Sequence, residues 1–393
     1  MQKSNVVFQK ASHLKVNSKL PDVGTTIFTV MSRMAAEEGA INLSQGFPDF
    51  DAPAELLSLV EKHMRLGHNQ YAPMEGLMIL REQIAAKVER LYGAQFDPET
   101  DITVTSGATE AIHSSISALV QPGDEVIILE PAYDCYIPSI KLNGGLPISV
   151  ELNSEDFSVP WEQVQASISE RTRLIMINTP HNPTGTVLSA NDLNQLAAII
   201  RDTKILVLSD EVYEHIIFDG QKHNSVLTHP ELAKRSVAVS SFGKTFHTTG
   251  WKIGYCVAPA FISREIRKVH QFLQFSVHTP SQFALAEYMQ SLDSYQFLAD
   301  FYQQKRDLFL KLTEKAPFKP LPSRGTFFQL FSYRGFSDMP DRELAEKMTK
   351  VNKLACIPMS VFYREKKDNH YLRFCFCKGD DTLTRGAEIL SSL

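Results

Sequence analysis

Short apolar runs alternate with helix-like stretches along the chain from about residue 100 onward. Seven runs have the length and the β-branched content of buried strands, at 102–105, 126–129, 148–152, 174–178, 205–208, 237–240 and 253–257. Stretches with helical periodicity lie between several of them, such as 109–119 and 189–201. This alternation predicts an α/β fold, in which helices cover both faces of a mostly parallel, seven-stranded sheet.

Helical periodicity dominates after residue 260, over the stretches 261–275, 281–292 and 301–312. The last hundred residues then mix two strand patterns with two helix patterns, at 327–331, 371–376, 341–353 and 383–390. The change of pattern predicts a second, smaller α+β domain. We therefore expect an N-terminal arm with part of the small domain (1–45), a large domain (46–285) and a small C-terminal domain (286–393).

The composition excludes several classes of protein. Of the 393 residues 43% are hydrophobic and 22% charged, which is ordinary for a soluble protein, and the net charge of −5 gives no basic surplus for nucleic acid. No apolar run reaches the roughly 18 residues of a membrane span, and the first residues show no secretory signal. Five scattered cysteines form no disulfide framework, and Cys375-x-Cys377 lacks metal-ligand spacing. We expect a cytoplasmic protein without a metal site.

A lysine among small residues marks the candidate chemistry. Lys244 lies between Gly243 and Thr245, just after a predicted strand. Such a lysine binds nucleotide phosphates in a P-loop, or it binds a carbonyl cofactor as a Schiff base. A P-loop needs a glycine where Ala238 stands and a helix directly after Thr245, but 246–250 is rich in β-branched residues and ends in glycine. A P-loop NTPase therefore stays a distant alternative.

A pyridoxal phosphate site needs further groups, and candidates for them follow other predicted strands. In parallel sheets, ligands bind at the edge formed by the carboxyl ends of the strands. Residues 105–110 leave a strand and open a helix, which makes either an anion site or only a capped helix start. Tyr133 could stack on a planar ring or simply pack. Asn182 could donate to a phenolic oxygen or only form a turn.

Two charged residues are candidates for binding opposite charges. Asp210 ends an apolar strand, where a carboxylate is costly unless it is paired, as it would be with a protonated pyridine nitrogen. Tyr213, three residues later, could donate to the same phenolic oxygen as Asn182. Arg373 alternates with the apolar residues of a strand and has the planar fork that binds a carboxylate. A helix cap and a structural salt bridge are the alternatives for Asp210 and Arg373.

With these residues in place, the chain resembles the class I/II aminotransferases, which are fold type I pyridoxal-phosphate enzymes. The resemblance runs from about residue 21 to the end and is closest to the bacterial methionine aminotransferases and the kynurenine/glutamine transaminases. It is carried by I-N-L-S-Q-G-F-P-D-F (41–50), N-Q-Y-A-P-M-E-G (69–76), S-D-E-V-Y-E-H (209–215) and S-S-F-G-K-T-F-H-T-T-G-W-K-I-G-Y-C-V-A-P (240–259).

The resemblance implies a role for each matching residue. Lys244 would form the imine with the cofactor and move the proton, Asp210 would pair with the pyridine nitrogen, and Tyr213 would assist at the phenolic oxygen. The other cofactor-binding residues would be Tyr71 (from the neighbouring subunit), Gly107, Ala108, Thr109, Tyr133, Asn182, Ser241 and Lys252. The substrate-binding residues would be Gly46, Phe47, Asn182, His278, Phe362 and Arg373. The shared Tyr71 implies a homodimer.

The implied reaction is a ping-pong transfer of an amino group from an amino acid to a 2-oxo acid. Relatives that act on dicarboxylates use a second arginine near the segment that corresponds to 272–283, and this chain has none there. We therefore expect an apolar and aromatic pocket that suits methionine, aromatic amino acids, glutamine or kynurenine. A cysteine-conjugate β-lyase, which would use the same residues, remains an alternative, and so does a non-catalytic pyridoxal-binding regulator.

Overall fold

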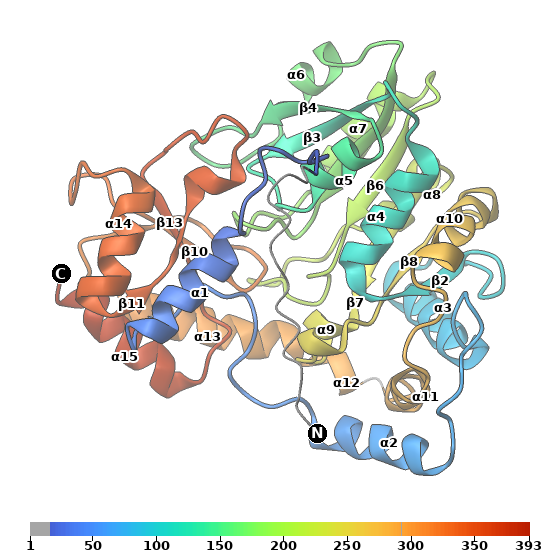
Figure 1. Cartoon of the computed structure of the whole chain (residues 1–393), viewed down its shortest axis with the longest axis horizontal. Helices are drawn as coiled ribbons and strands as arrows, with labels where there is room; N and C mark the ends of the chain where they lie inside the picture. The colour runs from blue at the N-terminus through green and yellow to red at the C-terminus, as the bar shows by residue number, and fades with distance from the viewer. Residues whose placement is uncertain (1–15, 292) are drawn as a thin grey trace, which may run out of the picture.

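The computed structural model describes residues 16–291 and 293–393. Its centre is a seven-stranded sheet in the order β2-β8-β7-β6-β5-β3-β4 (Figure 1). The strands are β2 (Ile102–Thr105), β3 (Glu125–Glu130), β4 (Leu146–Glu151), β5 (Thr172–Asn178), β6 (Leu206–Asp210), β7 (Ser236–Ser241) and β8 (Gly254–Val257). All neighbours pair in parallel except β8, which runs antiparallel to β2 and β7. The predicted α/β fold with its mostly parallel sheet is confirmed.

Both faces of this sheet are buried, which explains why its strands read as continuous apolar runs. In β3, Val126 and Ile128 join one hydrophobic cluster, whereas Ile127 and Leu129 join another. The first cluster includes residues of α4 (Gly107–Leu119), α5 (Tyr136–Leu142) and α10 (Ala260–Leu273). The second includes residues of α3 (Met78–Tyr92), α6 (Trp161–Ala166) and α7 (Ala190–Ile200).

The C-terminal part of the chain builds a second, antiparallel sheet in the order β12-β13-β10-β9. Its strands are β9 (Lys319–Pro320), β10 (Phe328–Ser332), β12 (Ile357–Pro358) and β13 (Tyr371–Cys375). Helices in this part are α13 (Leu298–Leu312), α14 (Asp341–Lys347) and α15 (Asp380–Ser391). The short elements α8 (Pro230–Ala233), α9 (Phe242–Thr245) and α12 (Asp293–Gln296) and the helices α2 (Ala54–Arg65) and α11 (Thr279–Tyr288) complete the fold.

The start of the described chain packs against this C-terminal part. The strand β1 (Ile41–Asn42) pairs in parallel with β11 (Leu354–Ala355). Helix α1 (Ile27–Glu37) lies beside the C-terminal elements (Figure 1). Residues 1–15 of the predicted N-terminal arm lie outside the described chain. The two domain boundaries stay predictions.

Some predicted helices differ from the observed ones at their ends. The pattern at 341–353 is α-helical only as far as Lys347, and Met348–Asn352 continue as a π-helix that ends at Lys353 with φ of 61°. The pattern at 281–292 begins earlier, at Thr279, because Pro280 suits the first turn of a helix. Within the described residues, no helix has both the length and the apolar character that crossing a membrane requires.

Candidate active site

A cavity of about 400 Å³ opens at the carboxyl ends of the parallel strands β5, β6 and β7. This volume falls within the range of small-molecule sites. Eleven of the residues predicted from the sequence line it: Gly46, Ala108, Thr109, Tyr133, Asn182, Asp210, Tyr213, Ser241, Lys244, Lys252 and Arg373. They come from segments up to 327 positions apart in the sequence (373 − 46), and the fold brings them together.

Five predicted residues lie outside the cavity lining. Gly107 begins α4 behind the Lys252 side chain, and Phe47 is held through its carbonyl oxygen by Lys378 Nζ at 2.7 Å. Phe362 lies 5.1 Å from the guanidinium of Arg373, and the His278 ring hydrogen-bonds Ser281 at 2.8 Å. Tyr71 is 81% exposed, and its ring contacts that of Phe275 with the ring centres 5.2 Å apart.

Sequence reasoning missed other lining residues: Phe28, Thr29, Gln45, Ile112, Asn178, Val212, Thr249 and Phe328. Phe28 lies on α1, far from the sheet in sequence, so no strand-end rule points to it. Asn178 and Val212 do stand at strand ends, beside Asn182 and Asp210, and the same rule applied to every strand would have found them.

Lys244 lies in the one-turn helix α9, directly after β7. Its Nζ donates a hydrogen bond to the Gly46 carbonyl at 3.1 Å. The same atom lies 5.5 Å from the ring centre of Tyr213 and 5.6 Å from that of Phe327. Burial lowers the pKa of Lys244, which makes the neutral, nucleophilic amine more accessible. Because α9 ends at Thr245, no long helix follows the lysine as a P-loop requires.

Asp210, at the end of β6, is buried in the floor of the cavity. It accepts hydrogen bonds from the Tyr136 hydroxyl at 2.7 Å and from the Val212 amide at 3.3 Å. Burial raises the pKa of Asp210 to about 6 in spite of these donors. Among the described side chains no cation forms an ion pair with this carboxylate, so the site favours a positively charged ligand atom beside it.

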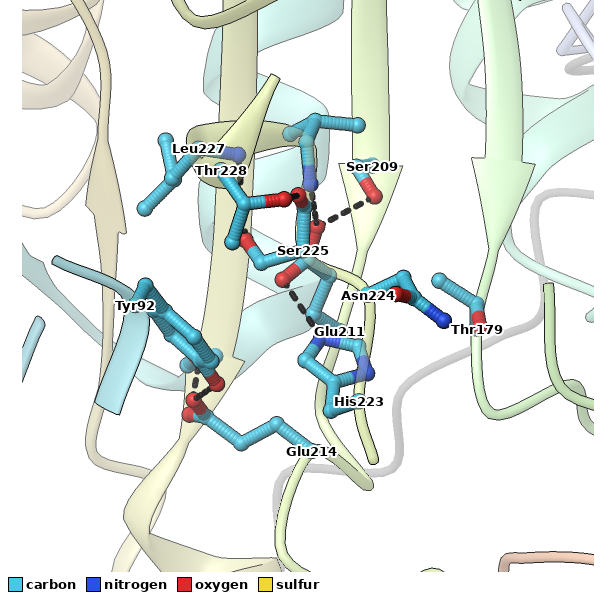
Figure 2. Close-up of polar contacts among 12 residues, drawn as sticks. Tyr92, Thr179, Ser209, Glu211, Glu214, His223, Asn224, Ser225, Leu227 and Thr228 are labelled. Atoms are coloured by element: carbon cyan, nitrogen blue, oxygen red, sulfur yellow. Dashed lines mark hydrogen bonds and ion pairs between the residues drawn. The ribbon is translucent and has the colours of Figure 1, made fainter. Parts of the chain in front are cut away.

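The loop that follows Asp210 is fixed by two more buried acids (Figure 2). Glu214 accepts hydrogen bonds from the hydroxyl of Tyr92 and from Lys87 Nζ at 2.6 Å. Burial alone would raise the pKa of Glu214, but the Lys87 ammonium holds it well below its usual range. Glu211 accepts from Ser209 Oγ at 2.8 Å, the Val226 amide at 3.0 Å and His223 Nε2 at 2.8 Å. These contacts orient the segment that carries Asp210 and Tyr213.

Arg373 and Asn182 form a linked pair on the opposite wall. Arg373 donates from Nη1 to the Asn182 side-chain oxygen at 2.7 Å and from Nη2 to the Ser44 carbonyl at 3.3 Å. Its Nε is buried without a partner among the described residues. Burial lowers the pKa of Arg373 to about 10, so the guanidinium stays charged and is short of a counter-charge. With the Asn182 oxygen occupied, its amide NH₂ remains as a donor.

The start of α4 forms an anion-binding corner of the cavity. The first amides of a helix have no partner within it, and here Ala108 and Thr109 lie on the cavity wall. A Cβ added to Gly107 would lie 3.3 Å from Lys252 Nζ, so this ammonium group is held against the helix start. Backbone amides, a hydroxyl and a lysine thus converge as they do in phosphate sites.

Comparisons with known proteins agree with this geometry. The family model for class I and II aminotransferases matches residues 38–390. Methionine aminotransferase of Escherichia coli (strain K12) is 52% identical over 377 residues, which cover 96% of this chain and 98% of that protein. Kynurenine–oxoglutarate transaminase of Dictyostelium discoideum is 33% identical, and the match covers 96% of this chain and 96% of that protein.

A solved structure is similar along almost the whole chain. The crystal structure of an E. coli protein, described as having a methionine aminotransferase function, superposes with a TM-score of 0.94 at 51% identity. The match covers 97% of this chain and 100% of the crystal structure's chain.

Proposed function

The chain belongs to the class I and II aminotransferases, and from this premise we propose that it transfers the amino group of methionine, or of a similar neutral or aromatic amino acid, to a 2-oxo acid. The observation that carries the proposal is one cavity lined by both Lys244 and Asp210, with the start of α4 at its side. The cysteine-conjugate β-lyase alternative is not favoured, because the similar proteins reported above are named as aminotransferases.

Enzymes of this family use pyridoxal phosphate, and the side chains of the cavity fit it. Its phosphate matches the anion-binding corner of Ala108, Thr109, Ser241 and Lys252. Its pyridinium nitrogen matches the carboxylate of Asp210, which has no ion-pair partner among the described residues. Its phenolic oxygen matches the donors of Asn182 and Tyr213, and its ring face matches Tyr133. When bound, the cofactor supplies an electron sink that makes the Cα–H bond of the amino acid acidic.

Lys244 would hold the cofactor through its side-chain amine, and the same amine would take the proton from the substrate Cα. Its lowered pKa supports this role, because a base must be neutral before it accepts a proton. The hydrogen bond from Nζ to the Gly46 carbonyl keeps the amine directed into the cavity.

Arg373 binds the substrate α-carboxylate in this proposal. Its buried Nε has no partner within the described part of the chain, and a carboxylate would supply both an acceptor and a counter-charge. The bond from Arg373 to the Asn182 oxygen also links the two binding places, so a bound carboxylate and a bound phenolic oxygen orient each other.

The side-chain pocket supports a neutral substrate. Phe28, Ile112, Tyr133 and Phe328 line the cavity, and the cations among its described lining residues are Lys244, Lys252 and Arg373. Once these three have the roles above, no cation remains for a second carboxylate. An aspartate side chain would therefore be desolvated without a partner, which is costly.

Rates with a panel of amino donors test the substrate class. Purified enzyme loaded with pyridoxal phosphate should use methionine or phenylalanine with a kcat/KM at least about 100-fold above that for aspartate, as unpaired charge burial implies. Pyruvate release from a cysteine conjugate is measured in parallel to separate β-elimination from amino transfer. Lys244→Ala is the control and should remove both transfer and the imine absorbance. Faster turnover of aspartate than of methionine would contradict the proposed class.

A homodimer completes the site in this proposal. Tyr71 is 81% exposed and lies near a cluster of exposed apolar side chains, Phe272 (87%), Leu273 (50%) and Phe275 (50%). An exposed apolar cluster of this kind marks a contact surface. In the dimer Tyr71 would reach the phosphate in the partner's cavity. A cytoplasmic location stays a prediction from the sequence.

A further inference from the structure

Phe328 of β10 lies against the guanidinium of Arg373. The guanidinium carbon is 3.8 Å from the centre of the Phe328 ring, well inside the roughly 6 Å range of cation–π contacts. At this distance the flat guanidinium lies over the face of the ring. Phe328 is only 2% exposed and lines the cavity, where it has counted so far as an apolar wall.

The pairing of two strands produces this stack. β10 and β13 run antiparallel, with Leu330 opposite Arg373. Phe328 is two positions from Leu330, so its side chain leaves the same face of the sheet and is a diagonal neighbour of Arg373. Diagonal neighbours reach each other when one side chain is aromatic and the other is long. The contact therefore follows from the register of the sheet.

Gly46 fixes the tip of the Phe328 ring. A Cβ added to Gly46 would lie 2.6 Å from Cζ of Phe328, closer than a Cβ approaches another atom. A residue without a side chain at this position therefore lets the ring lie beneath the guanidinium. The ring of Tyr213 packs against Phe328 at 79°, with the ring centres 6.1 Å apart. The Phe328 ring is thus confined between Gly46, Tyr213 and Arg373.

Stacking covers a face of the guanidinium and leaves its edge free. The N–H groups of an arginine all lie in the plane of its fork, and the weakly hydrated face stacks on aromatic rings. In that plane, Nη1 of Arg373 donates to Asn182 and Nη2 donates to the Ser44 carbonyl. Two hydrogen bonds in the plane and one ring on the face together fix the orientation of the group. Such ordering before the ligand arrives increases affinity, because binding then loses less freedom.

We propose that Phe328 is a positioning residue for the substrate α-carboxylate: its ring holds the guanidinium of Arg373 in the orientation that binds the carboxylate. The proposal rests on the proposed function, because it concerns the group that Arg373 binds there. Without the ring the guanidinium could tilt, and the substrate would have to order it again. A ring that only packs would contribute to stability and not to recognition of the carboxylate.

Two more aromatic rings lie near the same guanidinium but farther from it. The guanidinium carbon is 5.3 Å from the ring centre of Phe28 and 5.1 Å from that of Phe362. These two rings pack on each other, with centres 6.1 Å apart and planes tilted by 53°. Since Phe328 is the nearest of the three rings, its face sets the plane of Arg373.

A comparison of two amines tests the role of Phe328. Methionine and 3-(methylthio)propylamine differ by the carboxylate, and amino transfer from each to the holoenzyme is followed by the absorbance of the cofactor. In Phe328→Leu the ratio of the two kcat/KM values should fall about tenfold, the effect of one buried cation–π contact. The loss should appear as a higher KM for methionine. An unchanged ratio would overturn the proposal, because a ring that only packs affects both amines equally.

Equilibrium binding provides a second measurement that is independent of turnover. Isothermal titration calorimetry of the holoenzyme gives the Kd for 3-phenylpropionate, which should rise about tenfold in Phe328→Leu. The Kd for 3-phenylpropanol, which lacks the carboxylate, should stay within about twofold. Equal losses for both ligands would contradict the proposal and would mean that Phe328 only shapes the apolar wall.

Phe331→Leu is the matched control, because it makes the same change on the same strand. Phe331 is 1% exposed and packs against Phe309 and Phe374 instead of Arg373. This variant should leave the ratio of the two amines and both dissociation constants within about twofold of wild type. A loss of carboxylate recognition as large as that in Phe328→Leu would show a general effect of core packing and would overturn the proposal.

Gly46→Ala is a second variant, which displaces the ring without shortening it and keeps the test open if Phe328→Leu does not fold. It should lower the same ratio, and its effect should largely vanish in the double variant with Phe328→Leu, where the shorter side chain makes room. Losses that multiply in full would contradict the contact. If wild type transfers no amino group from methionine, the proposed function fails. If wild type does so and Phe328→Leu keeps the ratio, the role of Phe328 alone is wrong.

Discussion

Single side chains in this molecule are defined by partners that sequence reasoning does not reveal. Asp210 was predicted from its place at the end of an apolar strand, and the structure puts it in the cavity with Lys244. Nothing in the pattern of the chain indicated that the Tyr136 hydroxyl, 74 positions earlier, would donate to it. A strand end predicts where a side chain points, whereas the partner depends on how another helix packs over the sheet.

Burial of Asp210 makes the stability of the cofactor-free protein depend on pH. Its pKa is raised from 3.8 to about 6, so the folded state binds this proton more tightly than the unfolded state does. Stability from this group is fully present below pH 4 and is lost as the pH rises through 6. Relative to Asp210→Asn, the wild-type protein should lose about 3 kcal/mol or less between pH 4 and pH 7.

Urea unfolding of both cofactor-free proteins across this pH range measures the difference. Other titrating groups act equally in both proteins and cancel. Parallel pH profiles for the two proteins would mean that the carboxyl of Asp210 is not desolvated.

At the scale of elements, the strands were predicted well because both sheet faces are buried and leave a continuous apolar signal. The ends of helices were predicted less well. The π-helix at Met348–Asn352 keeps an apolar periodicity that cannot be told from an α-helix in the sequence. Phe28 of α1 lines the cavity, and the position of α1 depends on the parallel pairing of β1 with β11. Pairings between such short and distant strands leave no local pattern.

Gly254 permits the close contact between β8 and the start of α4. A Cβ at this position would lie 2.7 Å from the Ser240 carbonyl oxygen and 3.0 Å from the Ala108 amide nitrogen, both of them backbone atoms. Gly254→Ala should therefore destabilise the protein by about 1–3 kcal/mol through overpacking. It should also weaken cofactor binding, because the Ala108 amide would shift.

Gly250→Ala is the matched control for this prediction. Gly250 lies in the connection between β7 and β8, shortly before Gly254, and a Cβ added to it would meet no atom within 4 Å. Chemical unfolding and cofactor titration of both variants provide the measurements. Equal stability of the two variants would show that β8 and α4 have room to separate.

At the scale of the whole molecule, the fold class and the gathering of the site could be predicted, because strand ends in a parallel sheet meet at one edge. The same rule does not place Tyr71 and His278, since neither stands at the end of a strand of this sheet. Within the single chain, the exposed apolar cluster of Phe272, Leu273 and Phe275 supports the proposal of a homodimer.

Phe272→Asp should convert the proposed dimer to monomers, because a charge at the centre of an apolar contact would be desolvated without a partner. Sedimentation velocity at micromolar protein measures the change. Val351→Asp is the control, since Val351 is also highly exposed (67%) but lies in the C-terminal part of the chain. A Phe272→Asp protein that sediments like wild type would exclude this face as the contact surface.

The reversed direction of β8 has one more consequence. Because this strand runs against its neighbours, its beginning lies at the edge where the others finish, and Ser241 pairs with Gly254 across the junction. One hairpin therefore delivers both lysines, Lys244 from the outgoing arm and Lys252 from the returning arm. A deletion or insertion between them would displace the two amines relative to each other and would disturb both the cofactor-binding lysine and the phosphate-binding lysine. We therefore expect natural length variation to fall elsewhere in the chain.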